Sequence, residues 1–165
     1  MPTIKLETYI KANRDIVFDL SRSIDLQSEH VTDSSEKAVG GITSGLINPG
    51  ETVTYRGKHL GVKQDLTSKV TDFDRPNFFA DEMQKGAFKS MRHEHHFIAT
   101  GNGTIMKDAF HFESPLGILG KVANTLFLKS YMTNFLENRN KVIKEFAESG
   151  RWKEVLPEND IRYEN

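Results

Sequence analysis

Residues 77–114 read NFFADEMQKGAFKSMRHEHHFIATGNGTIMKDAFHFES. Three runs in this stretch have the length and the β-forming residues of strands, and two short turns separate them. The second turn contains Gly101-Asn-Gly103, whose residues tolerate the positive φ angles of tight hairpins. The stretch therefore predicts an antiparallel meander of three strands, over residues 77–83, 88–98 and 104–114.

Other strands and helices are expected on both sides of this meander. Residues that share a face alternate with their neighbours in three earlier runs, which predicts strands over residues 3–11, 51–59 and 63–73, and a further short strand is expected at 36–39. Two short helices are expected between the first two strands, one capped by Asn13 and one over 24–31. After Pro115, apolar residues recur every three or four positions as far as Phe146, which predicts one long helix that ends near Gly150. Leu126 and Phe127 belong to this apolar stripe, which is expected to be buried.

The composition is that of an ordinary globular domain. Of 165 residues, 37% are hydrophobic and 27% are charged, and the formal net charge is −1. Because the chain is nearly neutral and has no basic block, nucleic acid is not expected as a partner. The length suits a single domain, which we place at residues 1–150, followed by a C-terminal tail at 151–165. In the tail, Trp152, Val155 and Leu156 are expected to pack back onto the domain.

The sequence also bears on the compartment and on covalent chemistry. There is no cysteine, so disulfides, thiolate metal sites and cysteine nucleophiles are excluded. Residues 1–8 carry charges where a signal peptide has an apolar core, and no run approaches the ~20 apolar residues of a membrane span. We expect a cytoplasmic protein. The sequence leaves its oligomeric state open.

The order of elements predicts the fold class. One antiparallel sheet of six to seven strands must curl, because sheets twist. The long C-terminal helix is the element able to cover the concave face, which gives an α+β fold of two layers. A curled sheet around one helix leaves room for a pocket that is mostly apolar with a few polar groups.

This pattern resembles the helix-grip fold of the START / Bet v 1-like (SRPBCC) superfamily. Short motifs along the chain resemble a bacterial branch described as ligand-binding SRPBCC or cell-division-inhibitor-like proteins. They are Glu36–Gly45, Gly50–Tyr55, His59–Gly61, Leu66–Ser68, Phe79–Met83, Gly86–Phe88, His93–Phe97, Gly103–Asp108 and Pro115–Gly117. The resemblance implies the fold and a ligand-binding cavity. It implies no particular activity, because the superfamily includes lipid carriers, hormone receptors, polyketide cyclases and oxygenase domains.

The meander also places polar residues on the inner face of the sheet. A two-residue turn at Gly101-Asn102 sets a register in which His95 lies opposite Asp108 and His93 lies opposite Phe110. On the preceding strand, Asp81 is expected to point inward, where it can approach His93. The residues predicted to contact a ligand are Tyr55, His59, Phe79, Asp81, Met83, Met91, His93, His95, Phe97, Met106, Asp108, Phe110, Leu119, Val122 and Leu126. Arg139, Asn140, Lys141 and Lys144 are expected on the solvated face of the long helix.

Three interpretations of these histidines and aspartates compete. In the first, they form a buried polar pair that fixes the register of the sheet. In the second, they anchor the polar end of a ligand. In the third, they take part in catalysis or bind a metal. On a strand, His93-Glu-His-His96 is not the helical zinc motif, so we predict no metal and no cofactor. The leading hypothesis is a non-enzymatic module that binds a small hydrophobic or amphipathic molecule. The alternatives are a cyclase, dehydratase or hydrolase that uses His95 and Asp108 as an acid/base pair, and an interaction protein whose cavity is filled by its own side chains.

Overall fold

The structure is a computed structural model that describes residues 2–30, 36–114 and 121–157. In chain order the elements are β1 (Thr3–Ile10), α1 (Arg14–Ser21), α2 (Ile24–His30), β2 (Lys37–Gly41), β3 (Thr52–His59), β4 (Val62–Asp74), β5 (Phe78–Lys85), β6 (Ser90–Ala99), β7 (Thr104–Glu113), α3 (Lys121–Ser149) and a 3-10 helix, η2 (Arg151–Glu154). The strands form one antiparallel sheet in the order β1-β7-β6-β5-β4-β3-β2. The predicted α+β helix-grip architecture is therefore confirmed.

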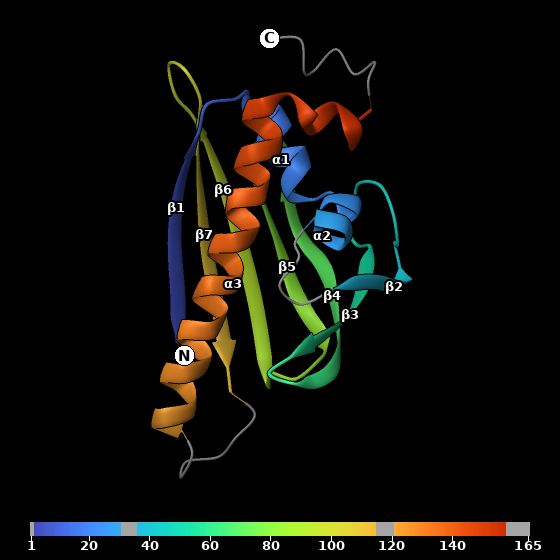
Figure 1. The fold of residues 1–165 in the computed structure, drawn as a ribbon, viewed down its shortest axis with the longest axis vertical. Helices are drawn as coiled ribbons and strands as arrows, with labels where there is room; N and C mark the ends of the chain where they lie inside the picture. The colour runs from blue at the N-terminus through green and yellow to red at the C-terminus, as the bar shows by residue number, and fades with distance from the viewer. Residues whose placement is uncertain (1, 31–35, 115–120, 158–165) are drawn as a thin grey trace.

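Figure 1 shows how the helices cover the sheet. The long helix α3 runs across one face of the curled sheet, and α1 and α2 lie on the same side. None of the helices in the part of the chain that the structure describes is both long and apolar enough to span a membrane. The predicted role of Pro115 in the first turn of the long helix lies outside the described residues.

The meander has the register that its turn predicts. The backbone N–H of Thr100 donates to the carbonyl of Gly103 at 2.8 Å and closes the hairpin between β6 and β7. As a consequence His95 pairs with Asp108 and His93 pairs with Phe110. On the other side of β6, Asp81 of β5 pairs with His93. All three pairings agree with the prediction.

One end of the molecule is held by an aromatic core around α1. The helix begins where expected, since the side chain of Asn13 accepts a hydrogen bond from the backbone N–H of Asp15 at 2.8 Å. Its fully buried Phe18 makes edge-to-face contacts with Phe79 and Phe97 at ring-centroid distances of 5.4 and 5.1 Å. From the C-terminal segment, Leu156 joins this core, and Trp152 and Val155 pack against it, which confirms the predicted docking of these residues.

Two parts of the prediction for α3 are wrong. The apolar spacing places Leu126 and Phe127 in the buried stripe, yet they are 65% and 58% exposed. Arg139 and Asn140 are expected on the solvated face, yet they are 4% and 2% exposed. The residues of this part of the helix that pack against the apolar cluster of the sheet are Leu128 and Met132 instead. In the C-terminal half, Arg139 lies three residues after Leu136, on the buried face.

Candidate functional site

A cavity of about 510 Å³ lies between the sheet and the helices. Most of its wall is apolar. The apolar lining residues are Ile24, Ile47, Val53, Leu60, Leu66, Val70, Phe79, Ala87, Phe88, Met91, Phe110, Phe127, Leu128, Met132, Phe135 and Leu136. Its size is within the range of pockets that enclose small organic ligands.

A minority of the wall is polar. The polar lining residues are Ser21, Arg22, Gln27, Glu36, Tyr55, His59, Gln64, Asp65, Ser68, Asp81, His93, His95, Ser114, Tyr131 and Arg139. Burial raises the pKa of Tyr55, so its hydroxyl is neutral at ordinary pH and can donate a hydrogen bond. A mixed wall of this kind suits a ligand that has both apolar surface and polar groups.

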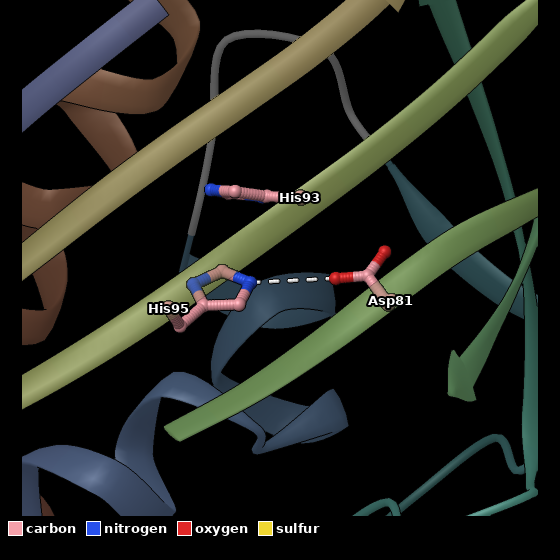
Figure 2. Close-up of side chains that lie close together, drawn as sticks. All are labelled: Asp81, His93 and His95. Atoms are coloured by element: carbon pink, nitrogen blue, oxygen red, sulfur yellow. Dashed lines mark hydrogen bonds and ion pairs between the residues drawn. The ribbon is translucent and has the colours of Figure 1, made fainter. Parts of the chain in front are cut away.

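The centre of the polar wall is a pair of histidines on β6. Figure 2 shows the His95 ring turned toward the Asp81 carboxylate of β5, whereas the His93 ring points away from Asp81. His93 is 6% exposed and His95 is 1% exposed, whereas the side chain of Asp81 is 21% exposed. The His95 ring stacks on Phe79 at a centroid distance of 4.2 Å, and this contact helps to fix its orientation.

The hydrogen bonds of the two histidines run diagonally between the strands. His93 Nε2 lies 2.9 Å from Oδ1 of Asp108, although its register partner is Phe110. His95 Nε2 lies 3.3 Å from Oδ2 of Asp81. The predicted closeness of His95 and Asp108 is present as well, since His95 Nδ1 is 3.1 Å from Asp108 Oδ1. However, this contact is too poorly aligned to be a hydrogen bond, and Nδ1 has no other hydrogen-bond partner among the described residues.

Asp108 is a buried carboxylate at the junction of three elements. Asn140 of α3 donates from Nδ2 to its Oδ2 at 2.6 Å, and Arg139 Nη1 lies 3.7 Å from its Oδ1. Arg139 also donates to the backbone carbonyl of Ser21 at 2.9 Å, which links α3 to the end of α1. The sequence prediction missed Arg139 and Asn140, even though the spacing of apolar residues along the helix could have indicated the inward position of Arg139.

The electrostatics of this group favour ionised aspartates and an uncharged His93. Burial and the neighbouring His95 lower the pKa of His93 to about 4, although its hydrogen bond to Asp108 acts in the opposite direction. Burial would raise the pKa of Asp108, but the two histidine contacts outweigh it and hold that pKa well below its ordinary value. The same holds for Asp81. Burial acts to raise its pKa, but the hydrogen bond with His95 lowers it, and the net result is a lowered pKa. The cavity wall therefore contains the ionised carboxylate of Asp81 and the uncharged imidazole of His93.

A second hydrogen-bonded group in the cavity wall is formed by Glu36, His59 and Tyr131. His59 Nδ1 lies 2.8 Å from the Tyr131 hydroxyl, and His59 Nε2 lies 2.7 Å from Oε1 of Glu36. All three side chains line the cavity. The apolar residues Leu60 and Phe127 line it nearby and are 53% and 58% exposed, which indicates that the cavity opens to solvent on this side.

A buried ion-pair cluster supports the cavity from α1. Asp19 is fully buried, and its two oxygens accept from Arg22 Nε and Arg75 Nη2, both at 2.6 Å. Arg22 lines the cavity and also donates to the backbone carbonyl of Ile47 at 3.0 Å. Arg75 also contacts Asp15 at 2.8 Å. This cluster holds α1 against the β4–β5 turn and the segment that follows β2.

The structure brings many of the predicted ligand contacts together at the cavity. Those that line it are Tyr55, His59, Phe79, Asp81, Met91, His93, His95 and Phe110. Their role in binding a ligand stays a prediction. Leu119 lies outside the described residues, and Val122 belongs to α3 but its side chain is not among those described.

Five predicted contacts are not in the cavity wall. Phe97 and Met106 are part of the core around α1, because the helix covers the sheet there. Met83 packs against the apolar cluster at the other end of the sheet. The side chain of Asp108, on the neighbouring strand β7, is fully buried. Leu126 is exposed on α3.

Comparison with known proteins shows similarity at the level of the fold. No protein-family model matches the chain, and no curated protein matches its sequence. The protein TTHA0849 from Thermus thermophilus is 18% identical, with a TM-score of 0.74, and the match covers 90% of this chain and 99% of that one. A START superfamily protein from Mycobacterium smegmatis is 10% identical, with a TM-score of 0.68, over 89% and 97% of the two chains. Major latex-like protein 151 from Panax ginseng is 13% identical, with a TM-score of 0.65, over 88% and 97%.

Proposed function

We propose that this chain, which has the helix-grip fold of START and Bet v 1-like structures, binds a small hydrophobic or amphipathic molecule in the cavity between its sheet and helices. The observation that carries the proposal is the cavity of about 510 Å³, with an apolar wall that is interrupted by convergent polar groups. Solved structures with the same fold support it, because the superfamily that they represent includes ligand carriers and receptors.

The wall also suggests how such a ligand is oriented. Burial of its apolar surface against residues such as Met91, Phe110 and Leu136 supplies most of the affinity. The carboxylate of Asp81 is ionised and partly accessible, so it favours a hydroxyl or amine group of the ligand. The Tyr55 hydroxyl offers a donor for a ligand oxygen. A ligand with apolar bulk and one polar end fits this arrangement.

Proton transfer on such a ligand is the second candidate function. It is favoured by the Asp81–His95 pair, which lines the cavity and is hydrogen-bonded at 3.3 Å. His95 would then act as the acid/base residue with Asp81 as its partner, because Asp108 is fully buried and does not line the cavity. The cavity volume itself disfavours the third hypothesis, a domain whose interior is filled by its own side chains.

A cavity-filling variant tests the binding proposal. Ser68 lines the cavity and is 7% exposed, so Ser68→Phe introduces a ring into the space that the ligand needs. The matched control is Lys63→Phe, an exposed position on the same strand. The probe is 1-anilinonaphthalene-8-sulfonate, an amphipathic dye whose fluorescence increases in apolar sites.

The wild type and Lys63→Phe are expected to bind one dye molecule per chain, and Ser68→Phe is expected to bind at least tenfold more weakly. Circular dichroism and thermal unfolding establish that both variants fold. Equal binding by a folded Ser68→Phe variant, or no saturable binding by the wild type, would contradict the proposal. Native mass spectrometry of the freshly purified protein then identifies the class of any molecule that it retains.

A further inference from the structure

We propose that Asp81, His93 and His95 form a binding site for one divalent transition-metal ion in the cavity wall. Each of the three side chains offers a ligand atom, and these atoms lie within 4.8 Å of one another. They come from the adjacent strands β5 and β6, and Figure 2 shows the Asp81 carboxylate and the His95 ring facing each other. The inference goes beyond ligand binding and does not depend on it.

The position of the His95 ring is the first reason. Its Nε2 lies 3.3 Å from Oδ2 of Asp81, and its Nδ1 lies 3.1 Å from Oδ1 of Asp108. In a tetrahedral site with metal–ligand distances of ~2.0–2.2 Å, two ligand atoms lie about 3.4 Å apart. Nε2 of His95 and the Asp81 carboxylate are therefore already spaced as two ligands of one metal ion.

The surroundings of the histidines are the second reason. A histidine that binds a metal usually donates its other ring N–H to a carboxylate, which fixes the ring and its tautomer. Asp108 Oδ1 lies 2.9 Å from Nε2 of His93, so this carboxylate can fix the His93 ring in that way. Asn140 fixes the other oxygen of Asp108 at 2.6 Å. The remaining nitrogens, Nδ1 of His93 and Nε2 of His95, are then free to act as ligands.

The donor set indicates which ions fit. Two imidazoles and one carboxylate suit Zn²⁺ and other first-row divalent ions rather than Ca²⁺ or Mg²⁺, which prefer oxygen donors alone. Three protein ligands leave at least one coordination position for water or another oxygen donor. Since all three residues line the cavity, that position is accessible from it.

The test is calorimetric titration of Zn²⁺ into the chelator-treated protein. The wild type is expected to bind one Zn²⁺ per chain, and bound metal is expected to raise the midpoint of thermal unfolding. Asp81→Asn and His95→Gln are each expected to weaken binding at least tenfold. His96→Gln is the matched control, because His96 is the neighbouring histidine on β6 and its side chain is 47% exposed.

The outcomes separate this proposal from surface binding and from ligand binding. If Asp81→Asn binds Zn²⁺ as tightly as the wild type, or if only His96→Gln loses binding, the site is not the one proposed. If the wild type binds no Zn²⁺ at micromolar concentrations, the proposal is wrong, whereas dye binding by the metal-free protein would still support the cavity as a ligand site. An Asp81→Asn variant with wild-type circular dichroism excludes misfolding as the cause of a loss.

Discussion

The amide nitrogen of Asn140 in α3 lies 2.6 Å from Oδ2 of Asp108 in β7, and both side chains are almost completely buried. This bond connects the long helix to the polar group in the sheet. It supplies a hydrogen bond to a carboxylate that burial would otherwise penalise. The position of α3 over the sheet and the orientation of the two histidines therefore depend on the same contact.

Loss of this contact should destabilise the protein. Asn140→Ala removes the donor and leaves a carboxylate oxygen of Asp108 without its partner, which is expected to lower the free energy of unfolding by about 2–3 kcal/mol. Asn134→Ala, at an exposed position on the same helix, should change it by less than about 0.5 kcal/mol. Urea unfolding followed by circular dichroism measures both. If both substitutions changed the free energy of unfolding by the same small amount, the contact between Asn140 and Asp108 would contribute little to stability.

The ion-pair cluster of α1 gives a second prediction. Asp19→Ala leaves the Arg22 guanidinium buried without its carboxylate partner, which is expected to cost about 3–5 kcal/mol. Asp15→Ala is the control, because Asp15 also pairs with Arg75 but its side chain is 25% exposed, and its loss should cost less than about 1 kcal/mol. Thermal and urea unfolding measure the difference. If the two variants lost similar amounts of unfolding free energy, burial of the Asp19–Arg22 ion pair would not be the cause of its larger contribution.

The stability of the metal-free protein should fall on mild acidification. The pKa of His93 is about 4 in the folded chain and about 6.5 in an unfolded one, so between these values the unfolded state binds a proton that the folded state does not. The contribution of His93 is complete above pH 6.5 and is lost as the pH falls to about 4, and the size of the shift corresponds to roughly 3 kcal/mol. The lowered pKa values of Asp81 and Asp108 extend the loss to lower pH.

This pH dependence is measured by urea unfolding at a series of pH values in the presence of a chelator. His93→Gln should flatten the slope of the unfolding free energy between pH 4 and 6.5, and the exposed His96→Gln variant should keep the wild-type slope. A wild-type slope in His93→Gln would mean that another group is responsible.

The sequence predicted the fold and the register well, for identifiable reasons. Alternation of side chains identifies strands, and the Gly101-Asn102 turn fixes which residues of β6 and β7 face each other. It could not predict that His93, rather than its neighbour His95, would hydrogen-bond to Asp108. Register places Cα atoms opposite each other, but the direction in which a ring leans depends on packing, here on the stacking of His95 against Phe79.

The sequence also failed where a polar residue occupies an apolar face. Met132, Leu136, Arg139 and Ile143 follow the three- and four-residue spacing of the buried stripe of α3. The charge of Arg139 suggested a solvated position, whereas its place in the three- and four-residue spacing of the apolar residues correctly indicates a buried one. Its burial depends on partners from distant elements, Asp108 in β7 and the Ser21 carbonyl in α1, which local patterns do not reveal.

The most direct test of ligand binding in the cavity is NMR of the protein labelled with ¹³C at its methionine methyl groups, during titration with 1-anilinonaphthalene-8-sulfonate. Met91 and Met132 line the cavity, whereas Met106 is fully buried in the core around α1. Binding in the cavity is expected to give saturable shifts of the Met91 and Met132 signals and to leave the Met106 signal unchanged. Shifts confined to the other methionines, or no saturable shift at Met91 and Met132, would contradict it.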